Sequence, residues 1–137
     1  MSLEIKIPTM EDQIKLVAKE SIREAIEVLE KNLEAPVFTG PDIDEEHYPR
    51  AHLLRKHEGW EAPHPEIVRA YFENFKDSFP EYGSDRKLAH LLGISSDRRI
   101  REFKQGAKKV PYEIWRKFLK ITGRAPQDFE KVLGFFS

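Results

Sequence analysis

The chain has 137 residues with a formal net charge of −1, and 39% of them are hydrophobic and 34% charged. This length fits one compact domain or a small domain with an extension, and the hydrophobic content argues against a disordered chain. Disulfides and thiolate metal sites are excluded because cysteine is absent. Since no apolar run approaches about 20 residues, we expect no membrane contact and a cytoplasmic location.

The N-terminal region predicts a long helix. Residues 3–7, LEIKI, alternate in the manner of a strand but have no evident partner strand, so we interpret them as an extended arm. Thr9 is a suitable N-cap with Asp12 three residues later, which predicts a helix from here to about Asn32. Its apolar stripe has helical spacing and comprises Ile14, Ala18, Ile22, Ala25, Ile26, Leu29 and Leu33. We expect this stripe to pack on its own domain, and a dimerisation helix is the alternative.

The next region predicts a linker. Residues 34–65 contain five of the nine prolines, which remove hydrogen-bond donors and break helices. We therefore expect three parts: an arm and amphipathic helix over 1–33, a Pro- and His-rich linker over 34–64 with at most a short helix, and a C-terminal domain over 65–137. Trp60, Val37 and Phe38 are expected to pin the linker to the core.

Four of the five histidines lie in this linker among acidic residues, at positions 47, 52, 57 and 64. Their spacing matches no zinc motif, such as two histidines one helical turn apart. We therefore expect no metal and no cofactor, and the four histidines favour a solvated polar loop. A metal-dependent enzyme is the weakest of the alternatives, since the sequence also lacks a phosphate-binding glycine loop, a nucleophile elbow and a cysteine nucleophile.

The C-terminal part predicts a bundle of helices. Residues 65–79 begin with proline and carry one broad apolar face, which is typical of a core helix. A second core helix is expected from Pro111 to Gly123. Pro126 should begin a short final helix, followed by the apolar tail Phe135-Phe136, which completes the core or contacts another subunit.

Between these core helices, residues 84–106 predict a helix-turn-helix. The first helix, 85–92, places leucines on one face, and Gly93 supplies the left-handed backbone geometry that ends it. Ser96 can cap the second helix, on which Ile100 and Phe103 face inward. The opposite face of the second helix is polar and cationic.

Charge is segregated along the chain in a way that favours a polyanionic partner. Residues 84–124 carry twelve Lys or Arg against four Asp or Glu, a net charge of +8, whereas residues 1–83 carry ten against eighteen, a net charge of −8. Arginines can bond guanine and glutamine can bond adenine in the major groove of DNA, so Arg98, Arg101 and Gln105 are the candidates for reading bases. The candidates for contacting phosphates are Ser95, Ser96, Lys87, Lys104, Lys108 and Lys109. Ordinary ion pairs of the arginines with Asp97 and Glu102 are the structural alternative.

The same stretch resembles the helix-turn-helix of the Xre/Cro/lambda-repressor-like DNA-binding family. The resemblance rests on Leu88-Ala89, the run from Leu91 to Ser95, the apolar pair Ile100 and Phe103, and Gly106, and it extends over residues 65–123. It implies a mostly α fold with a lambda-repressor-like helix-turn-helix bundle. It also implies a sequence-specific transcriptional regulator of double-stranded DNA, of phage or mobile-element type, and not an enzyme.

Two expectations concern partners. A single short recognition helix buries little surface, so we expect a homodimer that binds two half-sites. The alternative function is a protein-protein interaction module, such as an antitoxin-like protein or an adaptor, which would use the N-terminal helix or the C-terminal aromatic residues. Binding to a protein partner without DNA affinity would distinguish it.

Overall fold

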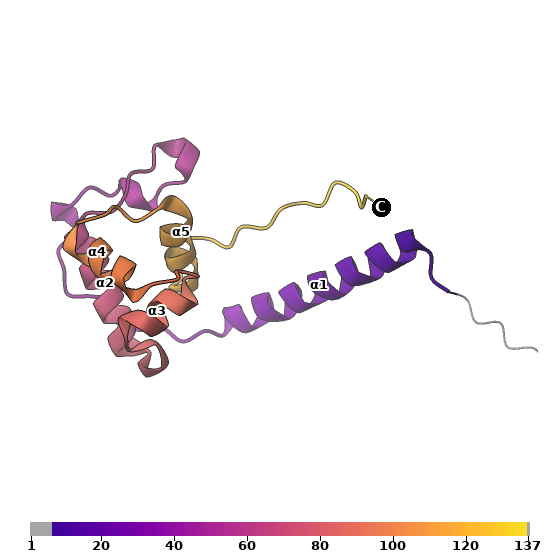
Figure 1. The fold of residues 1–137 in the computed structure, drawn as a ribbon, viewed down its shortest axis with the longest axis horizontal. Helices are drawn as coiled ribbons and strands as arrows, with labels where there is room; N and C mark the ends of the chain where they lie inside the picture. The colour runs from indigo at the N-terminus through magenta and orange to yellow at the C-terminus, as the bar shows by residue number, and fades with distance from the viewer. Residues whose placement is uncertain (1–6, 137) are drawn as a thin grey trace, which may run out of the picture. The chain divides into compact units, whose positions relative to one another are not determined.

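The computed structural model describes residues 7–136, and within them the protein has five α-helices and no β-strand. The helices are α1 (Met10–Leu33), α2 (Pro65–Ser78), α3 (Asp85–Leu91), α4 (Asp97–Gln105) and α5 (Tyr112–Ile121), as labelled in Figure 1. The prediction of a mostly α protein is therefore confirmed. The arm expected over residues 3–7 lies almost wholly outside the described residues. Between residues 7 and 136, no helix is long and apolar enough to cross a membrane.

The chain divides into two compact units. One unit spans Phe38–Asp128, and the other comprises residues 1–37 together with residues 129–137. Most of the segment that we expected to be a linker, 34–64, is thus part of the same unit as α2 to α5. That unit holds all the buried hydrophobic residues of the described chain.

Helix α1 begins where the sequence predicts. The hydroxyl of Thr9 accepts a hydrogen bond from the backbone N–H of Asp12 at 3.1 Å, and acidic residues occupy the first turn. Such caps satisfy backbone donors that have no partner within the helix. None of the residues of α1 is buried in the chain.

The core of the 38–128 unit is aromatic. Trp115, Phe72 and Phe118 are fully buried, with ring centroids of Phe72 and Phe118 4.9 Å apart in an edge-to-face arrangement. These rings come from α2 and α5, which are the two helices predicted to form the core. Helices α3 and α4 add Leu88 and Ile100, both at 0% exposure. The four helices therefore share one hydrophobic core.

A tight turn joins α3 to α4. Gly93 has a φ of 73°, and the backbone N–H of Ile94 donates to the carbonyl of Ala89 at 2.8 Å, so the end of α3 is closed by the turn itself. Ile94 is buried at 6% exposure. The hydroxyl of Ser96 then accepts from the N–H of Arg98 at 3.2 Å and caps α4. Helix, turn and helix thus follow the boundaries expected from the sequence.

The segment before α2 is fastened to the core by His52. Both tryptophans donate to this residue: the indole of Trp60 to its carbonyl and the indole of Trp115 to its Nδ1, each at 3.1 Å. Short 3-10 turns at Glu45–His47, Ala51–Leu53 and Lys56–Glu58 replace the short helix expected near residues 49–57. Prolines prevent a longer helix here, but they do not prevent packing.

The expectation that three apolar residues pin this segment is met only in part. Trp60 is half-buried against the core. The ring of Phe38 lies 4.6 Å from that of Phe79. Val37, in contrast, is 99% exposed, so it does not attach the segment to the core.

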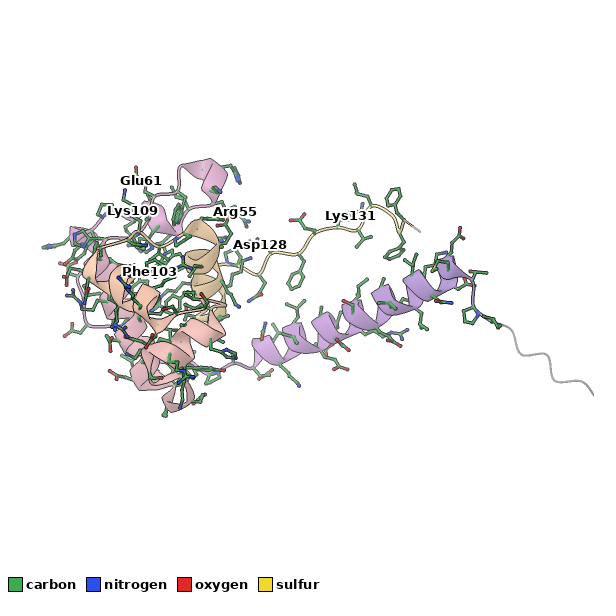
Figure 2. All side chains as sticks on the ribbon, viewed as in Figure 1. Arg55, Glu61, Phe103, Lys109, Asp128 and Lys131 are labelled. Atoms are coloured by element: carbon green, nitrogen blue, oxygen red, sulfur yellow. The ribbon has the colours of Figure 1, made fainter. Side chains whose placement is uncertain are left out.

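The C-terminal segment differs from prediction. Residues 124–136 contain no helix, so the short final helix expected from Pro126 is wrong. Phe129 and Leu133 are exposed at 60% and 92%, and a short helix without packed apolar residues is not stable in water. Asp128, near the start of this segment, lies beside Arg55 in Figure 2 and pairs with it at 2.8 Å.

Candidate nucleic-acid interface

The outer face of α4 carries the three side chains that the sequence predicts to read DNA bases. Arg98, Arg101 and Gln105 are exposed, and they line one shallow hollow of about 510 Å³. Ile100 and Phe103, on the other side of the helix, are buried at 0% and 2% exposure. The two sets separate because residues three or four apart lie on the same face of a helix.

Both arginines form ion pairs within α4. Arg98 Nε lies 2.9 Å from a carboxylate oxygen of Glu102, and Arg101 lies 3.0 Å from Asp97. The pair of Arg101 with Asp97 is exposed on both sides, and such pairs contribute only about 0.3–0.5 kcal/mol, whereas the Glu102 side chain is only 17% exposed. The Arg98 side chain remains 79% exposed and that of Arg101 49% exposed. Arg101 can therefore exchange Asp97 for an external acceptor at small cost, whereas release of Arg98 leaves the mostly buried Glu102 with only its loose contact to Lys108.

The start of α4 presents polar groups suited to an anion. Ser95 is exposed, and the Ser96 hydroxyl, while it accepts from the N–H of Arg98, still has its own proton to donate. The first N–H groups of a helix have no acceptor within the helix and attract negative charge. These two serines thus lie where a phosphate could be bound.

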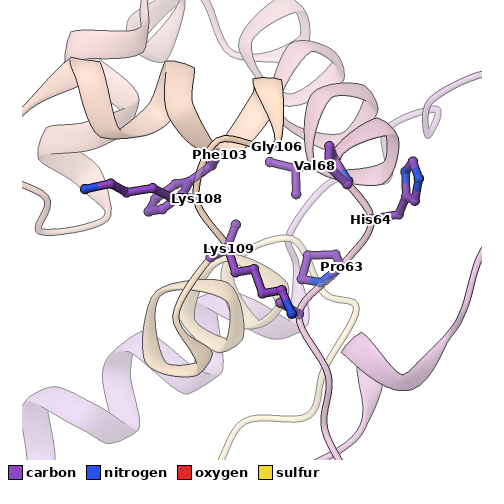
Figure 3. A pocket seen from close by; sticks show the side chains of 10 residues that line it. Pro63, His64, Val68, Phe103, Gly106, Lys108 and Lys109 are labelled. Carbon is purple, nitrogen blue, oxygen red and sulfur yellow. The ribbon is translucent and has the colours of Figure 1, made fainter.

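Three of the four predicted lysines are exposed next to α4. Lys87 lies on α3, and Lys108 and Lys109 lie in the loop that follows α4. Lys108 Nζ is 3.6 Å from Glu102, which is a loose contact. Figure 3 shows the side chains of Lys108 and Lys109 extending in different directions from the loop. These lysines are available to solution.

Lys104 has a different position from the one expected. Its ammonium group lies 2.7 Å from Glu73 of α2 and 3.0 Å from Asp85 of α3, and its side chain is only 15% exposed. Lys76 joins the same cluster through Asp85 at 2.9 Å. We call these four residues the charge cluster. Lys104 therefore holds α4 to two other helices, and we remove it from the candidates for phosphate contact.

The charge cluster changes the acidity of its carboxyls. The hydrogen bond from Lys104 holds the pKa of Glu73 below its ordinary value, although partial burial opposes this. Burial would raise the pKa of Asp85, but hydrogen bonds from Lys76 and Lys104 outweigh it and lower that pKa. Both carboxylates thus stay charged and paired near neutral pH.

The loop that carries Lys108 and Lys109 begins at a close approach between helices. Gly106 ends α4 with a φ of 78°, and a Cβ atom built there would meet the ring of Pro65 at 2.7 Å. Beside this contact lies a cavity of about 210 Å³, lined in part by Val68 and Phe103, as seen in Figure 3. Glycine at this position therefore allows α4 to end against the first residue of α2.

Sequence reasoning missed Arg69 as a member of this surface. Its guanidinium donates to the carbonyl of Lys104 at 3.1 Å, at the end of α4, and pairs with Glu66 at 2.9 Å. The side chain is 48% exposed and lines a hollow with Arg101 and Gln105. Arg69 belongs to α2, so no periodic pattern in the sequence relates it to α4.

Three of the four histidines of the 38–64 segment have separate local partners. His52 is buried against the two tryptophans, His47 pairs with Asp44 at 3.0 Å, and His64 accepts from the N–H of Glu66 as the cap of α2. Between residues 7 and 136, no three His, Asp or Glu side chains converge as a metal site would require.

Comparison with known proteins adds no relative. No protein-family model, curated protein or solved structure matches this chain. The exposed set on α4, with Lys87, Lys108, Lys109 and Arg69 around it, is accordingly the surface from which we infer function.

Proposed function

We propose that the protein binds double-stranded DNA in a sequence-dependent manner, with α3 and α4 acting as a helix-turn-helix of the Xre/Cro/lambda-repressor type. One observation carries the proposal: α4 buries Ile100 and Phe103 while it exposes Arg98, Arg101 and Gln105. One side of this helix packs on the core, and its other side presents arginines to solvent. Helices that enter the major groove of DNA have this arrangement.

Base reading is assigned to the exposed side chains of α4. Arg98 and Arg101 leave Asp97 and Glu102 to make bidentate bonds to guanine, and Gln105 pairs with adenine. Release of Arg101 from its surface pair costs less than about 1 kcal/mol, whereas a good bidentate contact contributes about 1–3 kcal/mol of discrimination. The intrahelical pairs thus orient the arginines in the free protein without preventing recognition.

Phosphate contacts are assigned to the residues around α4. Ser95 and Ser96 bind one phosphate at the start of the helix, and Lys87, Lys108 and Lys109 contact others. Such contacts fix the position of the helix in the groove and make affinity fall with salt. The resemblance further implies a cytoplasmic regulator of transcription, of phage or mobile-element type, that acts as a homodimer on two half-sites.

The test is selection of binding sites from a pool of random duplexes. The wild-type chain should enrich a defined motif, and Arg98→Ala with Arg101→Ala should bind the pool without enriching it. Lys117→Ala is the matched control, since Lys117 is exposed on α5 and should leave the motif unchanged. Enrichment of the same motif by the double variant would refute the assignment of the arginines.

A further inference from the structure

Helix α1 presents an apolar stripe, and within the described residues no member of this helix is fully buried. Six of its seven residues, all but Ile26 at the edge, form the central part of the stripe, namely Ile14, Ala18, Ile22, Ala25, Leu29 and Leu33. At 100° per residue they fall within an arc of about 100°, which is one face of the helix. Ile22 is 43% exposed and Leu33 is 83% exposed, and the other four members are half-buried. Since a helix in water gains most of its stability from packing of its apolar face, this stripe calls for a partner.

The spacing of the stripe is the same in both directions along the chain. Successive members are separated by four, four, three, four and four residues. Two copies of α1 laid antiparallel therefore match every member: Ile14 meets Leu33 of the second copy, Ala18 meets Leu29, and Ile22 meets Ala25. Each alanine then faces a larger side chain, so the layers fill evenly and the helices can approach closely.

The charges of α1 favour the same orientation. Residues 13–23 carry Lys15, Lys19 and Arg23 against one acid, whereas residues 24–34 carry four glutamates against Lys31. An antiparallel pair places each basic half beside the acidic half of the second copy. A parallel pair would instead place Lys15, Lys19 and Arg23 beside their own copies, and the glutamates of residues 24–34 beside theirs, which is destabilising. Glu11 and Asp12 lie outside the overlap of the antiparallel pair, because in that register they meet residues 36 and 35, beyond Leu33.

We propose that two copies of this chain associate through the stripes of their α1 helices, packed antiparallel about a twofold axis between residues 23 and 24. The occupant of the stripe is thus a second copy of the chain. This inference does not depend on the proposed DNA binding, because it uses no residue of α3 or α4. It goes beyond an expected homodimer by assigning the surface, the register and the direction.

The absence of cysteine makes disulfide trapping a direct test, because any thiol introduced is the only one in the chain. Ile14→Cys and Leu33→Cys are prepared as separate full-length variants and oxidised at low protein concentration, alone and mixed in equal amounts. The two positions are 19 residues apart, or about 28 Å along a helix. A disulfide forms only when the Cα atoms approach within about 7 Å.

The antiparallel pair predicts a disulfide-linked dimer in the mixture and at least tenfold less in either variant alone. Glu20→Cys, on the face of α1 opposite the stripe, is the control and should give no more linkage than the separate variants. Linkage of each variant with itself would overturn the proposal in favour of a parallel pair. No linkage in any sample, with a sedimentation mass of one chain for the wild type, would show that the stripe is covered by another partner or by the chain itself.

Discussion

His52 is a buried titratable group that makes the stability of the 38–128 unit depend on pH. Burial, with smaller effects from Arg50 and Arg124, lowers the pKa of His52 to about 4. In the unfolded chain the same imidazole takes up its proton near pH 6.5, so below that pH the unfolded state binds more protons. The free energy of unfolding is therefore at its full value above pH 6.5 and falls as the pH drops toward 4.

Denaturant unfolding at pH 7.0, 5.5 and 4.5 measures this effect. From the shift in pKa we expect a loss approaching about 3 kcal/mol across the window. In His52→Asn the amide oxygen can still accept from Trp115, so this variant should fold and lose most of the pH dependence. His57→Asn, at an exposed position, should keep it. An unchanged slope in the His52 variant would contradict our account of the site.

Gly106 and Gly93 separate two effects of a glycine. Both have positive φ values, of 78° and 73°, but only at Gly106 would a Cβ atom meet another residue, at 2.7 Å from Pro65. Gly93→Ala should therefore cost about 1 kcal/mol, from backbone conformation alone. Gly106→Ala should cost about 1–3 kcal/mol more, because α4 must move away from α2. Equal losses in denaturant unfolding would show that the contact with Pro65 is not tight.

At the scale of single residues, the sequence predicts the features that depend only on neighbours along the chain. Thr9, Ser96 and Gly93 could be recognised because a cap depends on residues within a few positions of it. His52 could not, since Trp115, the donor to its imidazole, is 63 positions away along the chain. The positions of Lys104 and Arg69 could not be predicted for the same reason, since their partners are also distant along the chain.

Helix α4 is held by the charge cluster, which gives Lys104 and Lys109 different roles. Lys104→Ala leaves Glu73 and Asp85 with Lys76 alone, and since these carboxylates are partly buried we expect a loss of about 1–2 kcal/mol in the free energy of unfolding. Lys109→Ala should leave stability unchanged and weaken DNA binding, because Lys109 is exposed.

The comparison requires both variants in both measurements, denaturant unfolding and DNA titration. If Lys104→Ala weakened DNA binding as much as Lys109→Ala while its stability remained that of the wild type, Lys104 would be a phosphate ligand after all. The matched design makes this distinction independent of the general effect of losing one positive charge.

Among the elements, those with strong apolar periodicity were predicted within a few residues. Helices α1 to α5 have that signal, together with caps or prolines at their ends. The helix expected from Pro126 failed because three apolar residues at helical spacing do not form a helix unless something packs on them. Residues 34–64 were expected to be a linker because their prolines exclude long helices. The packing of residues 38–64 depends on aromatic residues that are distant in the sequence.

At the scale of the whole molecule, charge and apolar surface are divided between regions. The excess of +8 lies in residues 84–124, which contain α3, α4 and α5. Helix α1 contributes an apolar stripe flanked by a basic segment, 13–23, and an acidic segment, 24–34. We propose that the first region binds DNA and the second joins two copies. The charges in the sequence alone favour a polyanionic partner. The exposure of the α4 face and of the stripe could be described only from the structure.

The most direct measurement is a fluorescence anisotropy titration of the full chain on genomic duplexes over a range of salt concentrations. Counterion release at Lys87, Lys108 and Lys109 predicts that the logarithm of the affinity falls linearly with the logarithm of salt, with a slope of about −3 per chain. Replacing these three lysines by alanine should flatten the slope toward zero. Absence of binding at low salt, or an affinity that does not change with salt, would contradict the proposal that this protein binds DNA through α4.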